Sequence, residues 1–457
     1  MAQQPLTVSS PQPGEVELDA SEIGRLTVEM SQRTLASGGP CDVVGIANQR
    51  ATTVVFDPAT GQPVGPALSW QDLRTVIDCL VLQGSGLRLA PNQSATKVKW
   101  LVDQSGRPAT ELRFATLESY VTWLLTGGEV HVSDHSNAGV TGLVAHGGQS
   151  WNVEIVEQLG LDPVMLPALV NTMGSVGAAS VLPGSPEIHA LIGDQPASLF
   201  GQSCVSPGAT KITFGTGAML DLVRGTEVPA TMTRYASGCF PIVARSQNDH
   251  LTWGVEGIVL SAGTCMEWLR DDLHLIESID ETAELALSVP STDGVTFVPA
   301  LLGLGTPQWD FGARAAFFGL TRGSSRAHLV RAVLEGIAHR GADLIAAASD
   351  EIGAPISEVR VDGGMTANRF LLQALADASG ARVAVSPERE ATTRGAGLMA
   401  LVSAGAVSIS EVESLWHGDD VVTPSTSDDE RAAARATWAS AVARSERTLP
   451  DLSNVSF

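Results

Sequence analysis

The chain has 457 residues, enough for two or three domains, and 44% of them are hydrophobic. Its formal net charge is −22, from 28 Lys and Arg against 50 Asp and Glu, which disfavours binding to the phosphate backbone of nucleic acids. The sequence holds no apolar run of about 18 residues and opens on a polar, proline-containing stretch, so we expect a cytoplasmic protein without a membrane span or secretory signal.

The first half of the chain alternates strand-like and helical segments. Residues 42–47 and 52–57 are short β-branched runs that predict strands, and residues 58–61 (PATG) predict a turn. Residues 94–104 carry apolar side chains on one side of a predicted helix. The five cysteines are odd in number and form no C-x-x-C pair, so we expect reduced, buried thiols rather than a zinc site or a disulfide framework.

The second half continues the alternation. Residues 209–222 predict two strands around a Gly-Thr-Gly turn, and residues 295–300 predict another strand. Ser325 is the expected N-cap of a long helix, and residues 358–362 form a strand before a double glycine. Residues 428–445 predict a surface helix. Strands that alternate with helices indicate α/β architecture, and the composition changes near residues 201–208, the best domain boundary.

Asp194 lies at the end of an apolar strand, in the segment IHALIGDQPASLFG of residues 188–201. Gln195 follows it, and Pro196 stands where a helix is expected to start. Connections from strand to helix are where α/β proteins bind ligands, so Asp194 is a candidate functional carboxylate. The local sequence equally allows Asp194 to be an ordinary N-cap.

Two glycine-rich segments are candidate nucleotide-binding loops. The first is KITFGTGAMLDL, residues 211–222, whose tight turn could surround a phosphate with backbone amides. The second is VDGGMTANRF, residues 361–370, where the double glycine lets a base or ribose approach the backbone. An ordinary hairpin explains the first segment as well, and a plain connection from strand to helix explains the second.

Longer segments resemble the FGGY carbohydrate kinases. The stretches SATKVKWLVDQ, residues 94–104, and AAFFGLTRGSSRAHLVRAVLE, residues 315–335, match two signatures of that family. GIANQRATTVVFD, residues 45–57, and VPALLGLGTPQWD, residues 298–310, are similar to glycerol kinases within it. The likeness extends from about residue 10 to residue 402.

The resemblance implies two actin-like (ribonuclease H-like) α/β domains, residues 1–204 for the substrate and residues 205–457 for the nucleotide, with ATP in the cleft between them. It implies ATP and Mg²⁺ as cofactors and a small polyol or sugar as the substrate, glycerol being the best single guess. Asp194 is then the general base that takes the proton of the attacking hydroxyl. The implied substrate-binding residues are Arg50, Trp70, Asp194 and Gln195; the implied nucleotide-binding residues are Gly215, Thr216, Gly217, Gly305, Gly363, Gly364 and Asn368.

The sequence departs from glycerol kinases inside the implied pocket. Ala51 stands where they have a glutamate that accepts hydrogen bonds from glycerol, and His135 replaces their pocket tyrosine. Met219 replaces an aromatic residue beyond the Gly-Thr-Gly turn. Because each lost hydrogen bond to a substrate hydroxyl costs about 1–3 kcal/mol, a different polyol or a ketose is the alternative substrate.

The family's first phosphate-binding hairpin, with its D-x-G-T motif, has no counterpart here, and residues 10–23 resemble the stretch that follows it. We expect a first domain truncated at its N-terminus, a weak kinase, and an exposed strand edge near residue 42. A mis-assigned start of the gene and a true loss of activity are both open, and the latter leaves a non-catalytic regulator that binds sugar or nucleotide. The metal ligands and any homo-oligomer are left open.

Overall fold

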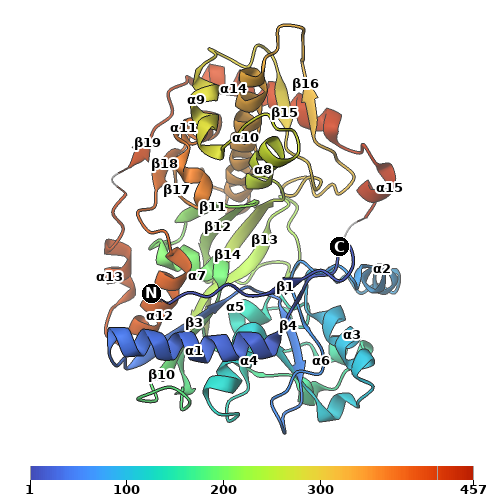
Figure 1. Ribbon diagram of the computed structural model, residues 1–457, viewed down its shortest axis with the longest axis vertical. Coiled ribbons are helices and arrows are strands. Elements are labelled where there is room, and N and C mark those ends of the chain that lie inside the picture. Colours follow the sequence, from blue (N-terminus) through green and yellow to red (C-terminus); the bar gives the residue numbers. More distant parts are fainter. Residues whose placement is uncertain (1, 419, 456–457) are drawn as a thin grey trace.

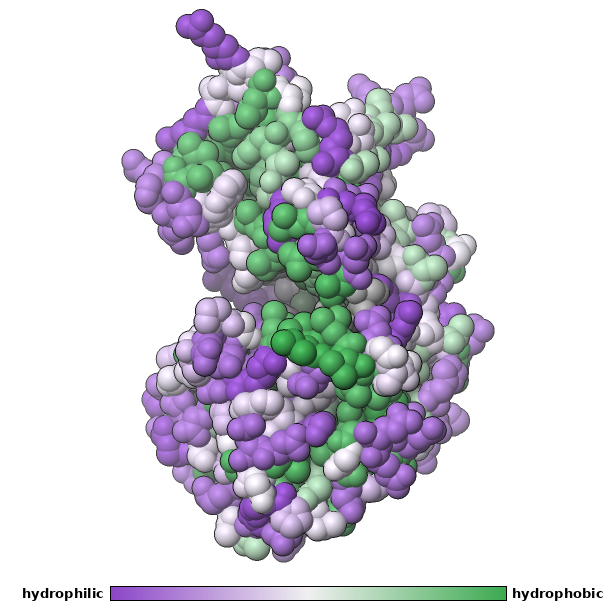
Figure 2. Space-filling view, turned by 90° about the vertical axis from the view of Figure 1, so that its right-hand side faces the viewer, coloured by the Kyte–Doolittle hydropathy of each residue, from purple (hydrophilic) through white to green (hydrophobic). Residues whose placement is uncertain are grey.

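The computed structural model describes residues 2–418 and 420–455, which form two lobes joined by a central sheet (Figure 1). Most of the N-terminal half builds the lower lobe, and most of the C-terminal half builds the upper one. The surface narrows between the lobes (Figure 2). On the side facing the viewer in Figure 2, helix α2 (Val76–Gly84) exposes Ile77 and Val81. No helix in these ranges is both long and apolar enough to cross a membrane.

One sheet of the lower lobe contains three strands in the order β3-β10-β9, namely β3 (Val43–Asn48), β10 (Glu187–Gly193) and β9 (Met173–Ala178). Strand β10 runs parallel to β3 and antiparallel to β9. Within the ranges that the structure covers, β3 pairs only with β10, and the side chains of residues 43–47 are half-buried. Strand β3 is therefore an edge strand with one row of free backbone groups.

The second sheet of the lower lobe has the order β1-β2-β5-β4-β6, and β7 and β8 form a small parallel pair. These strands are β1 (Val8–Ser9), β2 (Glu17–Leu18), β5 (Ala67–Leu68), β4 (Thr53–Phe56), β6 (Arg113–Thr116), β7 (Val132–Asp134) and β8 (Ala168–Val170). The remaining helices before residue 202 are α1 (Ala20–Gly38), α3 (Ala95–Ser105), α4 (Leu117–Leu125), α5 (His135–Ala138), α6 (Val153–Gln158) and α7 (Asp194–Gly201), with 3-10 turns at Ala109–Glu111 and Pro163–Met165.

The upper lobe is built on a seven-stranded sheet of order β13-β14-β12-β11-β17-β18-β19. These strands are β13 (Phe240–Gln247), β14 (His250–Val259), β12 (Ala218–Gly225), β11 (Thr210–Phe214), β17 (Glu358–Asp362), β18 (Arg382–Val385) and β19 (Val421–Val422), and β15 (Thr296–Val298) pairs with β16 (Ala316–Phe318). The helices of the C-terminal half of the chain are α8 (Gly263–Asp271), α9 (Thr282–Leu287), α10 (Arg326–Ile352), α11 (Arg369–Ser379), α12 (Ala391–Ser403), α13 (Ile409–Ser414), α14 (Asp428–Ser445) and α15 (Pro450–Ser453), with 3-10 turns at Ile279–Glu281 and Gly364–Ala367. Of these, α12 lies beside the lower lobe (Figure 1).

The two faces of this sheet differ in chemistry. Ile212, Leu220 and Val255 belong to a buried apolar core that includes Leu334 and Leu372 of helices α10 and α11. Residues one position away along the same strands point to the opposite face, because side chains alternate along a strand. That second face carries the charged residues of the candidate site.

Most predicted elements are confirmed within one or two residues. Ser325 is the N-cap of α10, and the predicted helix at residues 428–445 coincides with α14. One expectation is wrong: Cys41 is exposed, although the other four free cysteines are buried. Of the two readings left open for Asp194, the N-cap does not hold, because the N-cap of α7 is Gly193. Cys41 lies in the loop before the edge strand β3, where no second layer covers it.

The predicted domain boundary at residue 204 falls in the loop between α7 and β11 and stays a prediction. One later element does not respect it. Helix α12 packs on α7, β3 and β10, and its Ala396 and Met399 share an apolar cluster with Ile192 and Phe200. The C-terminal part of the chain therefore helps to cover the first lobe's sheet.

Candidate active site

Asp194 is the first residue of α7, directly after β10, and its carboxyl group is 34% exposed. Its Oδ1 accepts a hydrogen bond from the backbone N–H of the next residue, Gln195, at 2.8 Å. The side chain therefore does not accept from an N–H two or three residues further on, as an N-cap does. Gly193 lies under the side chain of Arg50, where an added Cβ would come within 2.4 Å of Arg50 Cγ. A glycine before Asp194 therefore lets the arginine lie directly over the end of the strand.

Arg50 joins the two lobes. Its Nε lies 3.4 Å from Asp194 Oδ1, and its Nη2 lies 2.5 Å from Oε1 of Glu256, which is on β14 of the upper lobe. Burial by itself lowers the pKa of Arg50, but the charges of Glu256 and Asp194 outweigh it and hold the pKa above its usual value. Nη1 is buried and has no hydrogen-bond partner in the described part of the chain. Arg50 therefore keeps an unused donor beside Asp194.

A row of charged side chains crosses the central sheet behind this pair. Lys211 on β11 lies opposite Asp221 on β12, and Asp221 lies opposite Glu256 on β14. Lys211 Nζ contacts Asp221 Oδ2 at 2.9 Å, and both side chains are fully buried. Burial raises the pKa of Glu256, and the charge of Arg50 opposes this effect. Buried charges of this kind persist only when they are paired, so the row holds the two lobes in register.

Sequence reasoning missed Glu256, Asp221 and Lys211 as members of the site. Glu256 and Asp221 each stand in a run of uncharged residues, TWGVEGIVL and AMLDLV, and Lys211 stands in the short strand TKITF. A charged side chain inside a strand that is buried on both faces needs a charged or hydrogen-bonding partner. A single charge in such a run was the sequence feature that could have identified these residues.

Trp70 follows β5 and is 37% exposed, so its indole is accessible to a ligand. The loop that carries it is anchored from α3, where Lys97 Nζ donates to the carbonyl oxygen of Ser69 at 2.6 Å. Val16 N–H donates to Asp72 Oδ2 at 2.7 Å on the other side of the loop. That Trp70 lines the same pocket as Arg50 stays a prediction.

The buried Lys97 gives a testable pH dependence. Burial lowers its pKa to about 7, opposed by the charge of Asp72. The folded protein thus binds fewer protons than the unfolded chain between pH 7 and 10, and the contribution of Lys97 to stability rises with pH across that window. We expect the wild type to gain about 2 kcal/mol in free energy of unfolding relative to Lys97→Met between pH 7 and pH 9.

Urea unfolding at pH 7, 8 and 9 measures this difference. Lys99→Met is the matched control, because Lys99 lies on the same helix with its side chain 42% exposed. If the difference in free energy of unfolding between wild type and Lys97→Met is the same at all three pH values, the lowered pKa of Lys97 is contradicted.

The two glycine-rich loops lie side by side. Strand β11 runs parallel to β17, and a Cβ on Gly363, after β17, would come within 2.2 Å of the carbonyl oxygen of Phe214, which precedes Gly215. Gly217 is equally confined, because an added Cβ there would lie 2.4 Å from the carbonyl oxygen of Val259. Gly364, by contrast, faces open space, and Thr216 is exposed. Two glycines therefore allow the backbones to pack, while the neighbouring positions leave backbone accessible to a ligand.

Asn368 and Gly305 have structural roles that the sequence did not separate from binding. Asn368 is the N-cap of α11, where its Oδ1 accepts from Leu371 N–H at 3.1 Å and its Nδ2 donates to Thr282 Oγ1 at 2.9 Å. Gly305 is buried, and an added Cβ would lie 2.2 Å from the carbonyl oxygen of Ile258. Both residues are accounted for by packing, and their contact with adenosine or ATP stays a prediction.

The three departures from the glycerol kinase pattern have definite surroundings. Ala51 is buried with a φ of 58°, and Met219 lies opposite Thr213 in the β11–β12 pair. His135 is buried, and its Nδ1 lies 2.9 Å from the carbonyl oxygen of Gly148. A carbonyl only accepts, and burial lowers the pKa of His135, so the neutral ring carries its proton on Nδ1 and leaves Nε2 as an acceptor.

The residues present are compatible with Mg²⁺ bound through a nucleotide. No group of three His, Cys, Asp or Glu side chains gathers in the part of the chain described here, which argues against an all-protein metal cage. Mg²⁺ is usually held by one or two carboxylates together with phosphate oxygens and water. Asp194 is the partly exposed carboxylate beside Arg50 that fits this need.

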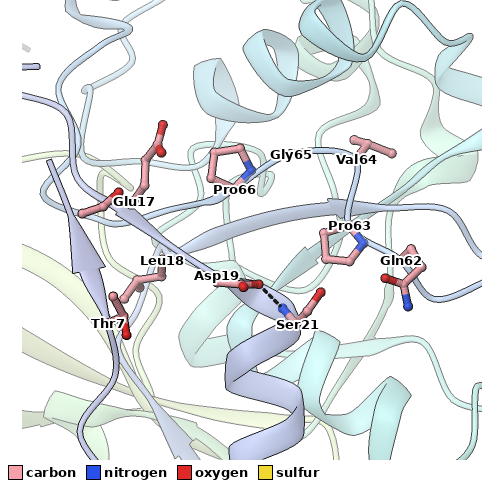
Figure 3. Close-up of a pocket in the computed structure, with 11 residues that line it drawn as sticks. Thr7, Glu17, Leu18, Asp19, Ser21, Gln62, Pro63, Val64, Gly65 and Pro66 are labelled. Carbon is pink, nitrogen blue, oxygen red and sulfur yellow. Dashed lines mark hydrogen bonds between the residues drawn. The ribbon is translucent and has the colours of Figure 1, made fainter. Parts of the chain in front are cut away.

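An open hollow of about 460 Å³ lies elsewhere, near the N-terminal end of α1 (Figure 3). Its lining includes Glu17, Asp19 and Gln62 and none of the candidate site residues. The first backbone amides of α1 already donate to Asp19, the N-cap, as the dashed line to Ser21 indicates. This hollow therefore offers no anion site at the helix end.

Comparisons with known proteins identify the family of the chain. The C-terminal domain of the FGGY family of carbohydrate kinases matches residues 210–404, and its N-terminal domain matches residues 1–182. Glycerol kinases of Coxiella burnetii and Dechloromonas aromatica are each 38% identical over 467 aligned residues, covering 97% of this chain and 92% of the relative.

Solved structures give the same fold. That of Plasmodium falciparum glycerol kinase with ADP superposes with a TM-score of 0.89 at 26% identity, covering 97% of this chain and 92% of the other. A ligand-bound xylulose kinase from Lactobacillus acidophilus superposes with a TM-score of 0.85 at 18% identity, covering 96% and 91%, and this likeness concerns the fold alone.

Proposed function

Because the chain belongs to the FGGY family of carbohydrate kinases, which transfer a phosphoryl group to an alcohol, we propose that it phosphorylates a small polyol or sugar, with glycerol as the best single guess. The observation that carries this proposal is the cluster of Asp194, Arg50 and Glu256, in which a partly exposed carboxylate stands beside an arginine with a free donor. The glycerol kinases at 38% identity support the choice of glycerol.

In this proposal Asp194 accepts the proton of the attacking hydroxyl, whose oxygen bonds to the γ-phosphorus of ATP while ADP leaves. Arg50 Nη1 donates to a neighbouring substrate hydroxyl, as does the amide of Gln195, and Trp70 packs on the carbon skeleton. The indole and these donors orient the substrate, with its reacting oxygen beside the carboxyl group of Asp194.

The nucleotide is assigned to the cleft between the lobes. We infer that the Gly215-Thr216-Gly217 turn receives the phosphates and that Gly363 and Gly364, with Asn368 and Gly305, border the adenosine. The Plasmodium glycerol kinase structure was solved with ADP, which supports an adenine nucleotide as the ligand. Mg²⁺ would be held by Asp194 and phosphate oxygens and would neutralise charge on the transferred group.

The changed pocket residues favour a second substrate class. Ala51 offers no carboxylate, and the neutral His135 presents an acceptor nitrogen where glycerol kinases have a tyrosine hydroxyl. A longer polyol or a ketose is therefore the alternative to glycerol. A non-catalytic regulator that binds sugar or nucleotide is a further candidate, favoured by the open edge of β3.

That open edge is where we propose the family's D-x-G-T hairpin would pair. Strand β3 offers a row of free backbone groups on the side away from β10, and Arg50 follows its last residue, Asn48, by two positions. A hairpin strand added there would complete the hydrogen bonds of β3 and bring its aspartate to the phosphate side of the cleft.

The test of the proposed function compares two forms of the protein with ATP, Mg²⁺ and a panel of polyols and ketoses, with ADP release as the readout. We expect the 457-residue chain to bind nucleotide with little turnover, and a form that carries a D-x-G-T hairpin upstream to turn over at least tenfold faster. A form whose hairpin aspartate is replaced by asparagine is the control. Equal, robust turnover by both forms would show that the hairpin is dispensable, and no turnover by either would favour the regulator.

A further inference from the structure

The side-chain amide of Gln195 is held in one orientation. Its Oε1 accepts a hydrogen bond from Lys211 Nζ at 2.7 Å. Because a lysine ammonium only donates, the carbonyl oxygen of the amide must face Lys211 and the NH₂ group must face away from it. Gln195 is half-buried in the first turn of α7, adjacent to Asp194.

Lys211 is itself fixed. Its Nζ donates hydrogen bonds to Gln195 Oε1 and to Thr213 Oγ1, the latter at 2.8 Å, and forms an ion pair with Asp221 Oδ2 at 2.9 Å. Lys211 and Asp221 are fully buried and stand opposite one another in the β11–β12 pair. The buried ion pair therefore fixes the position of the ammonium group beside the amide.

We propose that Lys211, held by Asp221, is a positioning residue that turns the NH₂ group of Gln195 toward the substrate and so makes it an obligate donor. This inference rests on the proposed function, because it assigns the polarity of one contact in that substrate pocket. An amide free to rotate could offer either its oxygen or its nitrogen to a hydroxyl. With the amide held in this orientation, the substrate must offer Gln195 an oxygen that accepts a hydrogen bond from the NH₂ group. This oxygen lies next to the hydroxyl that gives its proton to Asp194.

The polarity is set across the interface between the lobes. Gln195 belongs to α7 of the lower lobe, whereas Lys211 and Asp221 belong to the central sheet of the upper lobe. A shift of one lobe against the other would separate Lys211 from the amide. Orientation of the amide thus depends on the contact between the two lobes at Lys211 and Gln195.

The experiment measures dissociation constants by calorimetry for the 457-residue chain with glycerol and with 1,2-propanediol and 1,3-propanediol, each of which lacks one hydroxyl. We expect the wild type to bind glycerol about tenfold more tightly than the analogue that lacks the hydroxyl contacted by Gln195. The double variant Lys211→Met with Asp221→Leu removes both buried charges together, and its preference should fall to about twofold.

Two further variants separate positioning from structure. Gln195→Glu keeps an acceptor for Lys211 but has no N–H to offer, so it should lose the same preference. Thr213→Val removes one contact of Lys211 and leaves the bond to Gln195, so it should keep the preference. In turnover assays, the double variant should raise KM several-fold with kcat within about threefold of wild type.

Each outcome decides the inference. If the double variant weakens the binding of glycerol and of its analogues by the same factor, Lys211 acts only on the fold and the proposal is overturned. The proposal is also overturned if Gln195→Glu loses the preference for glycerol while the double variant keeps it. If neither the 457-residue chain nor the form with the upstream hairpin phosphorylates any member of the panel, yet the chain shows the expected binding preference, the proposed function fails and the positioning role stands. If the chain binds none of the three alcohols, both fail.

Discussion

Asp194→Asn should lower kcat for phosphoryl transfer by about a thousandfold while the protein stays folded. The amide has nearly the shape of the carboxylate but cannot accept the proton of the attacking hydroxyl. Arg50 keeps its contact with Glu256 at 2.5 Å in the variant, so its charge remains paired. The effect should therefore fall on chemistry rather than on stability.

The measurement is steady-state ADP release with the best substrate of the panel, in the form of the protein that turns over, together with thermal unfolding. Asp103→Asn on α3 is the matched control, since its carboxyl is 56% exposed and pairs only with Lys99. Turnover of Asp194→Asn near that of the control would exclude Asp194 as the base. A large drop in melting temperature would instead assign the loss to unfolding.

The second large effect concerns the buried pair of Lys211 and Asp221. Lys211→Met alone leaves the Asp221 carboxylate buried beside Glu256 with no cation opposite it. Removing one partner of a buried pair costs about 3–5 kcal/mol, a large share of the roughly 5–15 kcal/mol that stabilises a folded domain. Replacing both partners by apolar residues should cost far less, because no uncompensated charge remains.

Urea unfolding of Lys211→Met, Asp221→Leu and the double variant tests this expectation. The losses in free energy of unfolding of the two single variants, added together, should exceed the loss in the double variant, giving a coupling free energy of about 2 kcal/mol or more. Additive losses would show that the two charges do not stabilise each other. The result also validates the double variant as a folded protein for the binding experiment above.

The sequence predicted the α/β class, the family and most element positions, because these depend on local pattern. β-branched runs, Gly turns and a cap such as Ser325 act within a few residues, and the family signatures are contiguous. Asp194 and Arg50 were also found in this way, since each lies in a recognisable stretch. The sequence left open whether Asp194 is the N-cap of its helix, and the structure has Gly193 there, one residue earlier.

Only the tertiary structure decided which charges meet. Arg50 and Glu256 are 206 residues apart, and their contact exists because β3 ends against the central sheet of the other lobe. Lys211, Asp221 and Glu256 form a row through strand register, which one shift of pairing would destroy. The orientation of the Gln195 amide follows from that row. A charge in an apolar strand signals that a partner must exist, and the fold alone supplies the partner because the pairing is long-range.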